Sequence, residues 1–536
     1  MSRLLLVLCL LLAVPVLGVL GSWLGLDAAS LAVLRHQAET VLPGYVAQSL
    51  LLALVVALGV ALVGGACAAL VVLFEFPGRR VFEWALLLPL AMPAYVLAYA
   101  ATDFLQYSGP LQTTLRALTG AQGALWPDVR SLWGAAALFV LCLYPYVYLL
   151  VRTALGERAV PLMEAARLLG AGPGRRVREV ALPLARPALA AGVALALMET
   201  LADYGVGAYF GLQTFTTGIY KAWLVMNDRD AAAQLASLLL LVVAVLLWLE
   251  RRAQRRLRFA ASRRGAAHGA EARPLRLHGG AAALAVGVCA LPVLLGFVLP
   301  VAVLLRLLWQ EALHGEMGLP LARFAQWCWT SFKLAGIAAL LTTAVALALG
   351  FALRLRDSPA LQVGARVVSL GYAVPGAVIA VGILLPVGWL QARWPQAGAA
   401  ALVTGTLFGL MYAYLVRFSA VALQSVEAGY ARVPPAIDET ARMLGATRRR
   451  LFAELHAPLL NRAALAAVLL VFVDVMKELP ATLVLRPFDS DTLAVVANQL
   501  ARDERLGEAA LPSLAIVLVG LLPVLLLSRS LRAEPA

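Results

Sequence analysis

Long apolar runs constrain the fold of this chain more than any other sequence feature. A helix of about 20 residues crosses the ~30 Å hydrocarbon core of a bilayer. Of the 536 residues, 62% are hydrophobic and 14% are charged, an apolar excess that a soluble domain cannot bury. A backbone in lipid has to satisfy its own hydrogen bonds, and no alternating strand pattern is present, so we expect an all-α integral membrane protein. Twelve such runs lie near 4–25, 46–73, 83–102, 131–152, 188–208, 231–249, 281–308, 328–353, 366–390, 399–418, 463–485 and 511–528.

The twelve runs divide into two sets of six around a basic, Gly/Ala-rich segment at 251–280. We therefore expect two pseudo-symmetric six-helix modules, 1–250 and 281–536, joined by this segment as a cytoplasmic linker. The alternative is that 251–280 anchors on acidic lipid head groups. The first run is longer than the apolar part of a signal peptide and lacks an A-x-A cleavage site, so we interpret it as a spanning helix.

The basic residues indicate the orientation of the spans. Only three of the 44 basic residues are lysines, and the arginines gather in alternate short loops. Loops of this kind mark the cytoplasmic side of a membrane protein, so we expect both termini on that side and no binding of nucleic acid. The protein would be a multi-pass protein of a bacterial inner membrane.

A short motif occurs twice between these runs. Residues 164–170 read E-A-A-R-L-L-G, and residues 439–445, located 275 positions later, read E-T-A-R-M-L-G. Each copy is followed by a proline at the same distance. A repeat of this length indicates two versions of one module. The motif residues are Glu164, Ala165, Ala166, Gly170 and Pro183 in the first copy and Glu439, Ala441, Gly445 and Pro458 in the second.

Local signals predict a short helix in each loop, at about 157–187 and 427–462. Prolines open helices well, so we expect the first helix to begin at Pro161 and the second at Pro434 and Pro435. The motif glycine then ends each helix in the left-handed conformation, and Thr447 is the expected cap of the helix that follows. The result is a short helix with an apolar stripe, suited to docking on a partner. The alternative is an interfacial helix that lies on lipid.

The two loops resemble the EAA loops of ABC importer permeases, in which this segment is the coupling helix that docks on the ATPase subunit. The sequences at 198–223 and 475–494 are similar to the two halves of fused ferric-iron permeases. The second loop departs from the strict motif, with Thr440 in place of an alanine and Ala457 in place of a leucine. The resemblance covers most of the chain and implies a fused, two-module permease.

This resemblance also implies partners and a cargo. Two copies of a separate ATPase and a periplasmic substrate-binding protein would complete an importer for ferric iron. Related fused permeases transport thiamine and other small solutes, which remains an alternative. The outward loops would contact the binding protein, and the candidate residues are Gln213, Thr217, Asp491 and Thr492.

The sequence itself supports a separate ATPase. None of the lysines, Lys221, Lys333 and Lys477, has the glycine-rich context of a P-loop. No catalytic cluster or metal-ligand pattern is present, and the five cysteines form no CxxC pair. We therefore expect no enzymatic activity, metal or cofactor in this chain, with ATP and Mg used by the partner.

Carboxylates inside apolar runs are costly and need an explanation. Glu199 and Asp203 lie four residues apart, and their counterparts 275 residues later are Asp474 and Glu478, with Lys477 between them. One hypothesis is that these residues flank a translocation path and favour a cationic substrate. The alternative, of equal weight, is that they only hydrogen-bond neighbouring helices or pair with Lys477.

Two other classes of protein share some of these features. An ion-coupled secondary transporter also predicts charged residues within the membrane, but its repeats are often inverted. Here both repeats have the same topology and carry the loop on the same side, which favours the ATP-driven importer. A membrane scaffold would not need the buried carboxylates.

Overall fold

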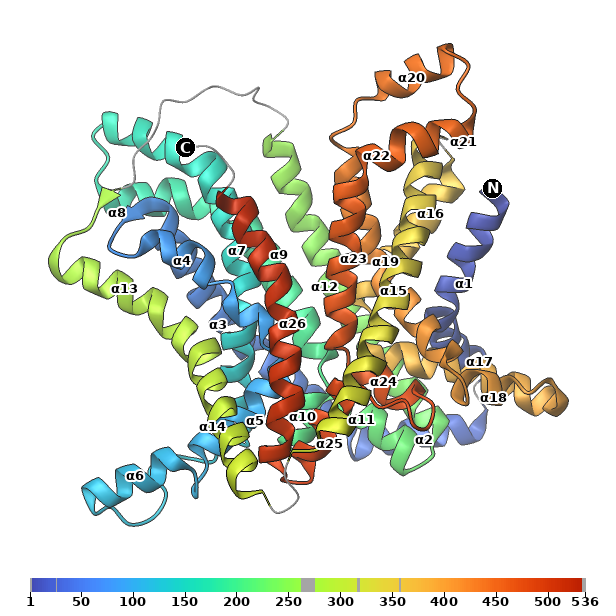
Figure 1. Cartoon of the computed structure of the whole chain (residues 1–536), viewed down its shortest axis with the longest axis horizontal. Coiled ribbons are helices and arrows are strands. Elements are labelled where there is room, and N and C mark those ends of the chain that lie inside the picture. The colour runs from blue at the N-terminus through green and yellow to red at the C-terminus, as the bar shows by residue number, and fades with distance from the viewer. Residues whose placement is uncertain (1, 26, 262–274, 316–318, 356–357, 533–536) are drawn as a thin grey trace. The chain divides into compact units, whose positions relative to one another are not determined.

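The computed structural model describes residues 2–25, 27–261, 275–315, 319–355 and 358–532, and the chain is almost entirely helical (Figure 1). Within these described residues, ten helices are long and apolar enough to span a membrane, or up to twelve if each of two bent pairs is one span. The bent pairs are Arg79–Ala91 with Ala94–Thr119, at 91°, and Arg448–Leu459 with Asn461–Met476, at 70°. Each of the twelve predicted runs overlaps one of these spans, and the all-α membrane fold is confirmed.

The chain forms two compact units, and each unit draws helices from both sequence halves. Unit 1 contains Met1–Ala38, Gly218–Leu240 and Pro320–Val496, and unit 2 contains Glu39–Thr217, Leu241–Leu319 and Ala497–Ala536. The compact units therefore divide the chain differently from the modules 1–250 and 281–536, which describe the sequence repeat and remain a prediction.

In unit 1, α1 packs on α17, α16, α15 and α19, and α15, α19 and α23 pack on one another. Its elements are α1 (Ser2–Gly21), η1 (Ser22–Gly25), α2 (Ala28–Glu39), η4 (Lys221–Val225), α15 (Leu321–Leu355), α16 (Pro359–Val368), η6 (Gly371–Ala373), α17 (Gly376–Arg393), η7 (Pro395–Ala397), α18 (Ala399–Thr404), α19 (Leu407–Tyr430), α20 (Pro435–Met443), α21 (Arg448–Arg450), η8 (Leu451–His456), α22 (Ala457–Leu459), α23 (Asn461–Met476) and α24 (Pro480–Leu485).

In unit 2, α3, α7 and α9 form the centre, and α14 and α26 pack on each other and on α5. Its elements are α3 (Leu42–Leu73), β1 (Phe74–Glu75), α4 (Arg79–Ala85), η2 (Leu88–Ala91), α5 (Ala94–Leu105), α6 (Pro110–Thr119), α7 (Leu132–Leu168), α8 (Pro173–Arg176), η3 (Val177–Ala181), α9 (Leu182–Ala202), α10 (Gly205–Tyr209), β2 (Leu275–Arg276), α13 (Gly279–Val293), η5 (Leu294–Val298), α14 (Leu299–His314) and α26 (Leu506–Arg532). The helices α11 (Phe215–Tyr220), α12 (Arg229–Ala261) and α25 (Leu493–Arg502) extend from one unit into the other.

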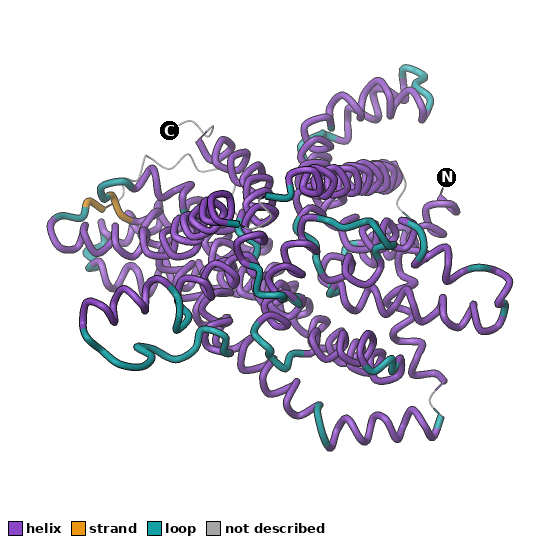
Figure 2. The backbone as a smooth tube through the Cα atoms, turned by 60° about the horizontal axis from the view of Figure 1, so that its bottom comes forward, coloured by secondary structure: helices purple, strands orange, loops and turns teal. Residues whose placement is uncertain are grey.

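The segment predicted as a linker is partly ordered. The helix α12 continues to Ala261, and β2 pairs in parallel with β1, the two short strands visible among the helices in Figure 2. Residues 262–274 lie outside the described part of the chain.

Side-chain caps recur at the same places in both sequence halves. The Ser49 hydroxyl on α3 accepts a hydrogen bond from the Phe215 amide at the start of α11, at 3.2 Å. The Ser331 hydroxyl on α15 accepts one from the Leu493 amide at the start of α25, at 2.9 Å. These serines satisfy amides that a helix start leaves unpaired. The repeat seen in the sequence is thus also a repeat of local geometry.

Candidate functional site

The first motif loop follows the long helix α7. Its glycine, Gly170, has φ +81°, and the Ala171 amide donates to the Ala166 carbonyl at 2.9 Å while the Gly170 amide donates to the Arg167 carbonyl at 3.0 Å. This pattern is a Schellman motif, which ends a helix by capping its last carbonyls. The predicted role of Gly170 as a helix stop is confirmed.

The second loop repeats this geometry. Gly445 has φ +82°, the Ala446 amide donates to the Ala441 carbonyl at 3.0 Å, and the Gly445 amide donates to the Arg442 carbonyl at 2.9 Å. The chain then resumes as helix at α21, where the Thr447 side chain accepts from the Arg450 amide at 3.3 Å. The predicted cap at Thr447 is therefore also confirmed.

Each loop exposes two large apolar side chains directly before its glycine. Leu168 and Leu169 are 85% and 88% exposed, and Met443 and Leu444 are 89% and 82% exposed. Apolar side chains grouped in this way beside polar ones are typical of interaction sites. Glu164 is half-buried and Glu439 is exposed, so the motif acids flank these pairs rather than bury themselves in a core. Figure 1 shows α20, which carries the second pair, beyond the ends of α15, α19 and α23.

The two loops begin differently. The helix α7 is continuous from Leu132 to Leu168, so the prediction that a helix begins at Pro161 is wrong. In the second loop the prediction holds, because α20 begins at Pro435 after Pro434 adopts an extended conformation with φ −58° and ψ 139°. A residue that precedes a proline is disfavoured in the helical region of backbone conformation. The Pro434-Pro435 pair therefore interrupts the helix between α19 and α20.

A polar network holds α20 on its unit. Asp438 of α20 is buried and accepts a hydrogen bond from the Arg354 Nε of α15 at 2.6 Å. His456 of η8 lies with its Nε2 3.1 Å from the Asp438 Oδ1 and its Nδ1 3.0 Å from the Tyr430 hydroxyl of α19. The Arg354 Nη2 also donates to the Val433 carbonyl at 2.8 Å. The carboxylate thereby joins α15, α20 and η8, and His456 extends the network to α19.

Sequence reasoning missed this network. The sequence signal that could have indicated the network is a titratable residue near one end of each element: Arg354 in α15, Asp438 in α20 and His456 in η8. Such residues are also common in exposed loops, and only the tertiary structure shows that these three meet. At the corresponding positions of the first loop the chain has Arg79, Met163 and Ala181, so the network belongs to the second loop alone.

An exposed ion pair is common to both loops. Arg175 Nε lies 2.9 Å from Glu179 Oε2, and Arg450 Nε lies 2.8 Å from Glu454 Oε2, again 275 residues apart. Both pairs lie where the chain returns to the membrane through a π-helical segment, η3 or η8. Pro183 and Pro458 follow these segments, near the starts of α9 and α22.

Two of the predicted path carboxylates cap short helices. The Asp203 Oδ1 accepts from the Val206 amide at 2.8 Å, at the start of α10. The Glu478 carboxylate accepts from the Ala481 and Thr482 amides at 2.9 and 3.0 Å, at the start of α24. The predicted spans 188–208 and 463–485 are therefore interrupted at these carboxylates, which is a correction to the predicted span ends.

The two carboxylate pairs differ in their cations. In unit 1, Asp474 pairs with Lys477 at 3.0 Å, and Glu478 pairs with Arg417 at 3.3 Å. In unit 2 the corresponding positions, 275 residues earlier, are Ala202 and Cys142, which carry no positive charge. Glu199 lies half-buried one turn before Asp203 on α9. In each pair one acid lies near the end of a spanning helix, α9 or α23, and the other lies just beyond it, and the pair in unit 2 lacks the cations found at the corresponding positions in unit 1.

The candidate contacts for a binding protein lie in or just before the short helices α11 and α25. The Thr217 hydroxyl donates to the Leu212 carbonyl at 2.8 Å, and the Thr492 hydroxyl accepts from the Val495 amide at 3.4 Å, so both brace their own turns. Gln213 is exposed, and the Asp491 carboxylate forms an ion pair with Arg486. Among the described residues, no group of three or more His, Cys, Asp and Glu side chains could hold a metal ion.

Comparisons with known proteins agree with this geometry. Residues 61–259 match the family of binding-protein-dependent transport system inner membrane components. The chain is 26% identical over 485 residues to the Fe(3+)-transport system permease protein FbpB 2 of Haemophilus influenzae, covering 90% of this chain and 88% of that protein. It is 28% identical over 194 residues to the molybdenum transport system permease protein ModB of Escherichia coli, covering 34% and 82%. A putative 2-aminoethylphosphonate transport system permease, PhnU of Salmonella choleraesuis, is 27% identical over 181 residues, covering 33% and 63%.

The fold, the repeated loops and these matches together define the class of protein that the chain resembles, the multi-pass inner-membrane permeases of ABC importers. A permease of this kind works with an ATPase and a substrate-binding protein. The relatives above are permease subunits rather than enzymes, and their names include more than one substrate.

Proposed function

We propose that this chain moves ferric iron across the inner membrane, as a fused permease that serves two copies of a separate ATPase. The observation that supports it best is the pair of matching loops, each with a Schellman glycine and two exposed apolar residues. The ferric-iron assignment rests on the similarity over 90% of the chain to a Fe(3+) permease. Thiamine or another small solute is the second candidate, because shorter relatives carry molybdenum and 2-aminoethylphosphonate in their names.

In this proposal each loop docks one ATPase subunit. Leu168 and Leu169, or Met443 and Leu444, enter a groove on the ATPase, and Glu164 or Glu439 lies beside the contact. The loops and both termini face the cytoplasm, where ATP and Mg bind to the partner and not to this chain. Apolar anchors surrounded by polar residues are the usual energetic centre of such an interface.

The proposed path runs beside Glu199, Asp203, Asp474, Glu478 and Lys477. No iron-chelating group is needed here if the binding protein holds the ion until release. On the opposite side from the loops, Gln213, Thr217, Asp491 and Thr492 belong to the turns proposed to contact that binding protein.

Docking is tested by binding of the partner ATPase to the purified permease. The double variant Leu169→Asp/Leu444→Asp should lose binding, because it replaces exposed apolar side chains with charges at both loops. The matched control is Leu118→Asp on α6 of unit 2, a leucine that is also exposed, at 78%, and that lies on the side of unit 2 away from α8 (Figure 1). Equal binding by both variants would exclude docking at the loops.

Transport is tested in proteoliposomes that contain the permease, its ATPase and its binding protein. ATP-dependent uptake of ferric iron that fails in Glu164→Arg/Glu439→Arg would support both the cargo and the coupling loops. ATP-dependent uptake of another solute without iron uptake would keep the importer and replace the cargo. Uptake that depends on a proton gradient and not on ATP would contradict the coupling mechanism.

A further inference from the structure

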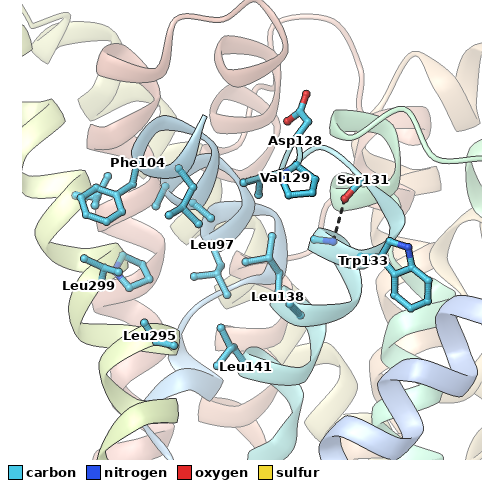
Figure 3. Close-up of a pocket in the computed structure, with 18 residues that line it drawn as sticks. Leu97, Phe104, Asp128, Val129, Ser131, Trp133, Leu138, Leu141, Leu295 and Leu299 are labelled. Atoms are coloured by element: carbon cyan, nitrogen blue, oxygen red, sulfur yellow. Dashed lines mark hydrogen bonds between the residues drawn. The ribbon is translucent and has the colours of Figure 1, made fainter. Parts of the chain in front are cut away.

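A cavity of about 370 Å³ lies in unit 2 between α5, α7 and the η5–α14 segment (Figure 3). Its walls are almost entirely apolar, with Leu97 and Phe104 from α5, Leu138 and Leu141 from α7, and Leu295 and Leu299 from η5 and α14. All three elements belong to candidate membrane spans. Ala137 lines the cavity and is exposed, so the cavity opens at the surface of the unit.

One end of the cavity is closed by a tight contact between helices. A Cβ atom at Gly296 of η5 would lie 2.9 Å from the Leu141 carbonyl oxygen of α7. Only a glycine allows the two backbones to approach this closely. Beyond this contact α14 packs on α5 and α26, which leaves a gap between α14 and the beginning of α7.

The depth of the cavity matches one leaflet of a bilayer. It extends along α7 from Ser131, which caps the helix start, to Leu141. With 1.5 Å of rise per residue this distance is about 15 Å, and half of the ~30 Å hydrocarbon core is also about 15 Å. The cavity therefore begins at the level of the head groups and ends near the middle of the membrane.

The open rim has the polarity of a membrane interface. Trp133 is 63% exposed at the rim, and tryptophan is enriched at the interface between lipid and water. Figure 3 shows the Asp128 carboxylate directed away from the apolar lining. A free fatty acid would bring only a carboxylate close to Asp128, and like charges repel. A zwitterionic phospholipid also carries an ammonium group that a carboxylate attracts, so such a phospholipid fits this rim better.

We propose that this cavity binds one acyl chain of a phospholipid from the leaflet opposite the Glu164 loop. The chain lies between α5, α7 and α14 with its end near Gly296, and its head group stays at the rim formed by Asp128 and Trp133. The bound chain fills the space that α14 leaves beside α7 and makes α14 part of the packed surface of unit 2. This site does not depend on the identity of the transported solute.

The test uses the full chain in nanodiscs that contain a phospholipid with a diazirine near the end of one acyl chain. After irradiation, labelled peptides are located by mass spectrometry. The expected labels concentrate in 97–105, 134–141 and 295–303, relative to exposed lipid-facing positions such as Leu54, Leu58 and Leu62 of α3. Even labelling of all these surfaces would overturn the proposal.

A pair of matched variants separates the cavity from the rest of the lipid-facing surface. Ala137→Phe places a ring in the cavity without disturbing a core position, and it should lower cavity labelling about tenfold, the ratio that loss of roughly two buried methylene groups produces. Ala283→Phe on α13, also exposed but outside the cavity, should leave labelling unchanged. Equal labelling of the two variants, or labelling by a diazirine fatty acid and not by the phospholipid, would contradict the proposed occupant.

Discussion

Single residues set a difference in charge between the two repeats. Asp474 and Glu478 each face a cation, Lys477 or Arg417, whereas the corresponding positions beside Glu199 and Asp203 are Ala202 and Cys142. Asp203 and Glu478 also cap short helices, so both have a structural role whatever else they do. Glu199 is consequently the acid in these pairs whose charge is available to attract a cation.

Glu199→Gln should therefore slow the uptake of a cationic substrate more than Asp474→Asn does. We expect a loss of about fivefold for Glu199→Gln, since one unit charge at a few ångströms in a water-like medium is worth about 1 kcal/mol. Initial uptake rates in proteoliposomes give the comparison, with ATPase binding as the control that should not change. An equal loss in both variants would mean that the acids contribute structure and not the charge of a path.

At the scale of single elements, the two motif loops share their local geometry but differ in how they are anchored. Both loops end in the same Schellman geometry, and both glycines have a φ near +80° that other residues enter at a cost. The loops are nevertheless held differently, because the first directly follows a long helix and the second follows a separate short helix that is anchored through Asp438. The two loops proposed to contact the ATPase are thus supported by different interactions within this chain.

Gly170→Ala/Gly445→Ala should weaken ATPase binding. The left-handed conformation costs alanine about 1–2 kcal/mol at each position, and the loop is expected to relax and move the apolar pair before it. Gly172→Ala is the matched control, since Gly172 lies in the same loop without a left-handed φ and a Cβ there would meet nothing within 4 Å. Titration of the ATPase against each variant measures the effect, and equal affinities would show that the loop geometry is not needed for docking.

Asp438→Asn should loosen α20 without unfolding unit 1. Loss of the carboxylate leaves the Arg354 guanidinium largely buried without its counter-charge, and breaking a buried pair in this way costs about 3 kcal/mol. Hydrogen exchange of 435–446 should become faster in this variant. Glu454→Gln, which removes an exposed pair worth at most about 1 kcal/mol, should leave exchange near the wild-type rate; similar exchange in the two variants would contradict the role of the network.

At the scale of the whole molecule, the sequence predicts where the spanning helices lie better than it predicts which helices pack together. The apolar runs predict the spans because hydropathy reports whether a segment can cross lipid, and the repeat predicts the two loops with Gly170, Gly445 and Thr447 in their observed roles. The grouping of helices into compact units could not be predicted from the sequence in the same way. Lipid tails are as apolar as leucine, so a hydrophobic run carries little information on which helix it packs against. The ion pair between Arg354 and Asp438 is also invisible in sequence, because 84 residues separate its partners.

The composition of the compact units leads to a prediction for a divided chain. Unit 1 needs α1 from the first half, and unit 2 needs α13, α14 and α26 from the second, so each half on its own leaves the packing surfaces of these helices uncovered. Cutting the chain between Ala261 and Leu275 and expressing 1–261 together with 275–536 should yield a complex that copurifies through a tag on one fragment. Either fragment expressed alone should be degraded or aggregate, because exposed packing faces in a membrane find other partners. Accumulation of one fragment alone, as a monomer at the level of the full chain, would show instead that each sequence half folds as an independent module, and this outcome would favour the division at 251–280.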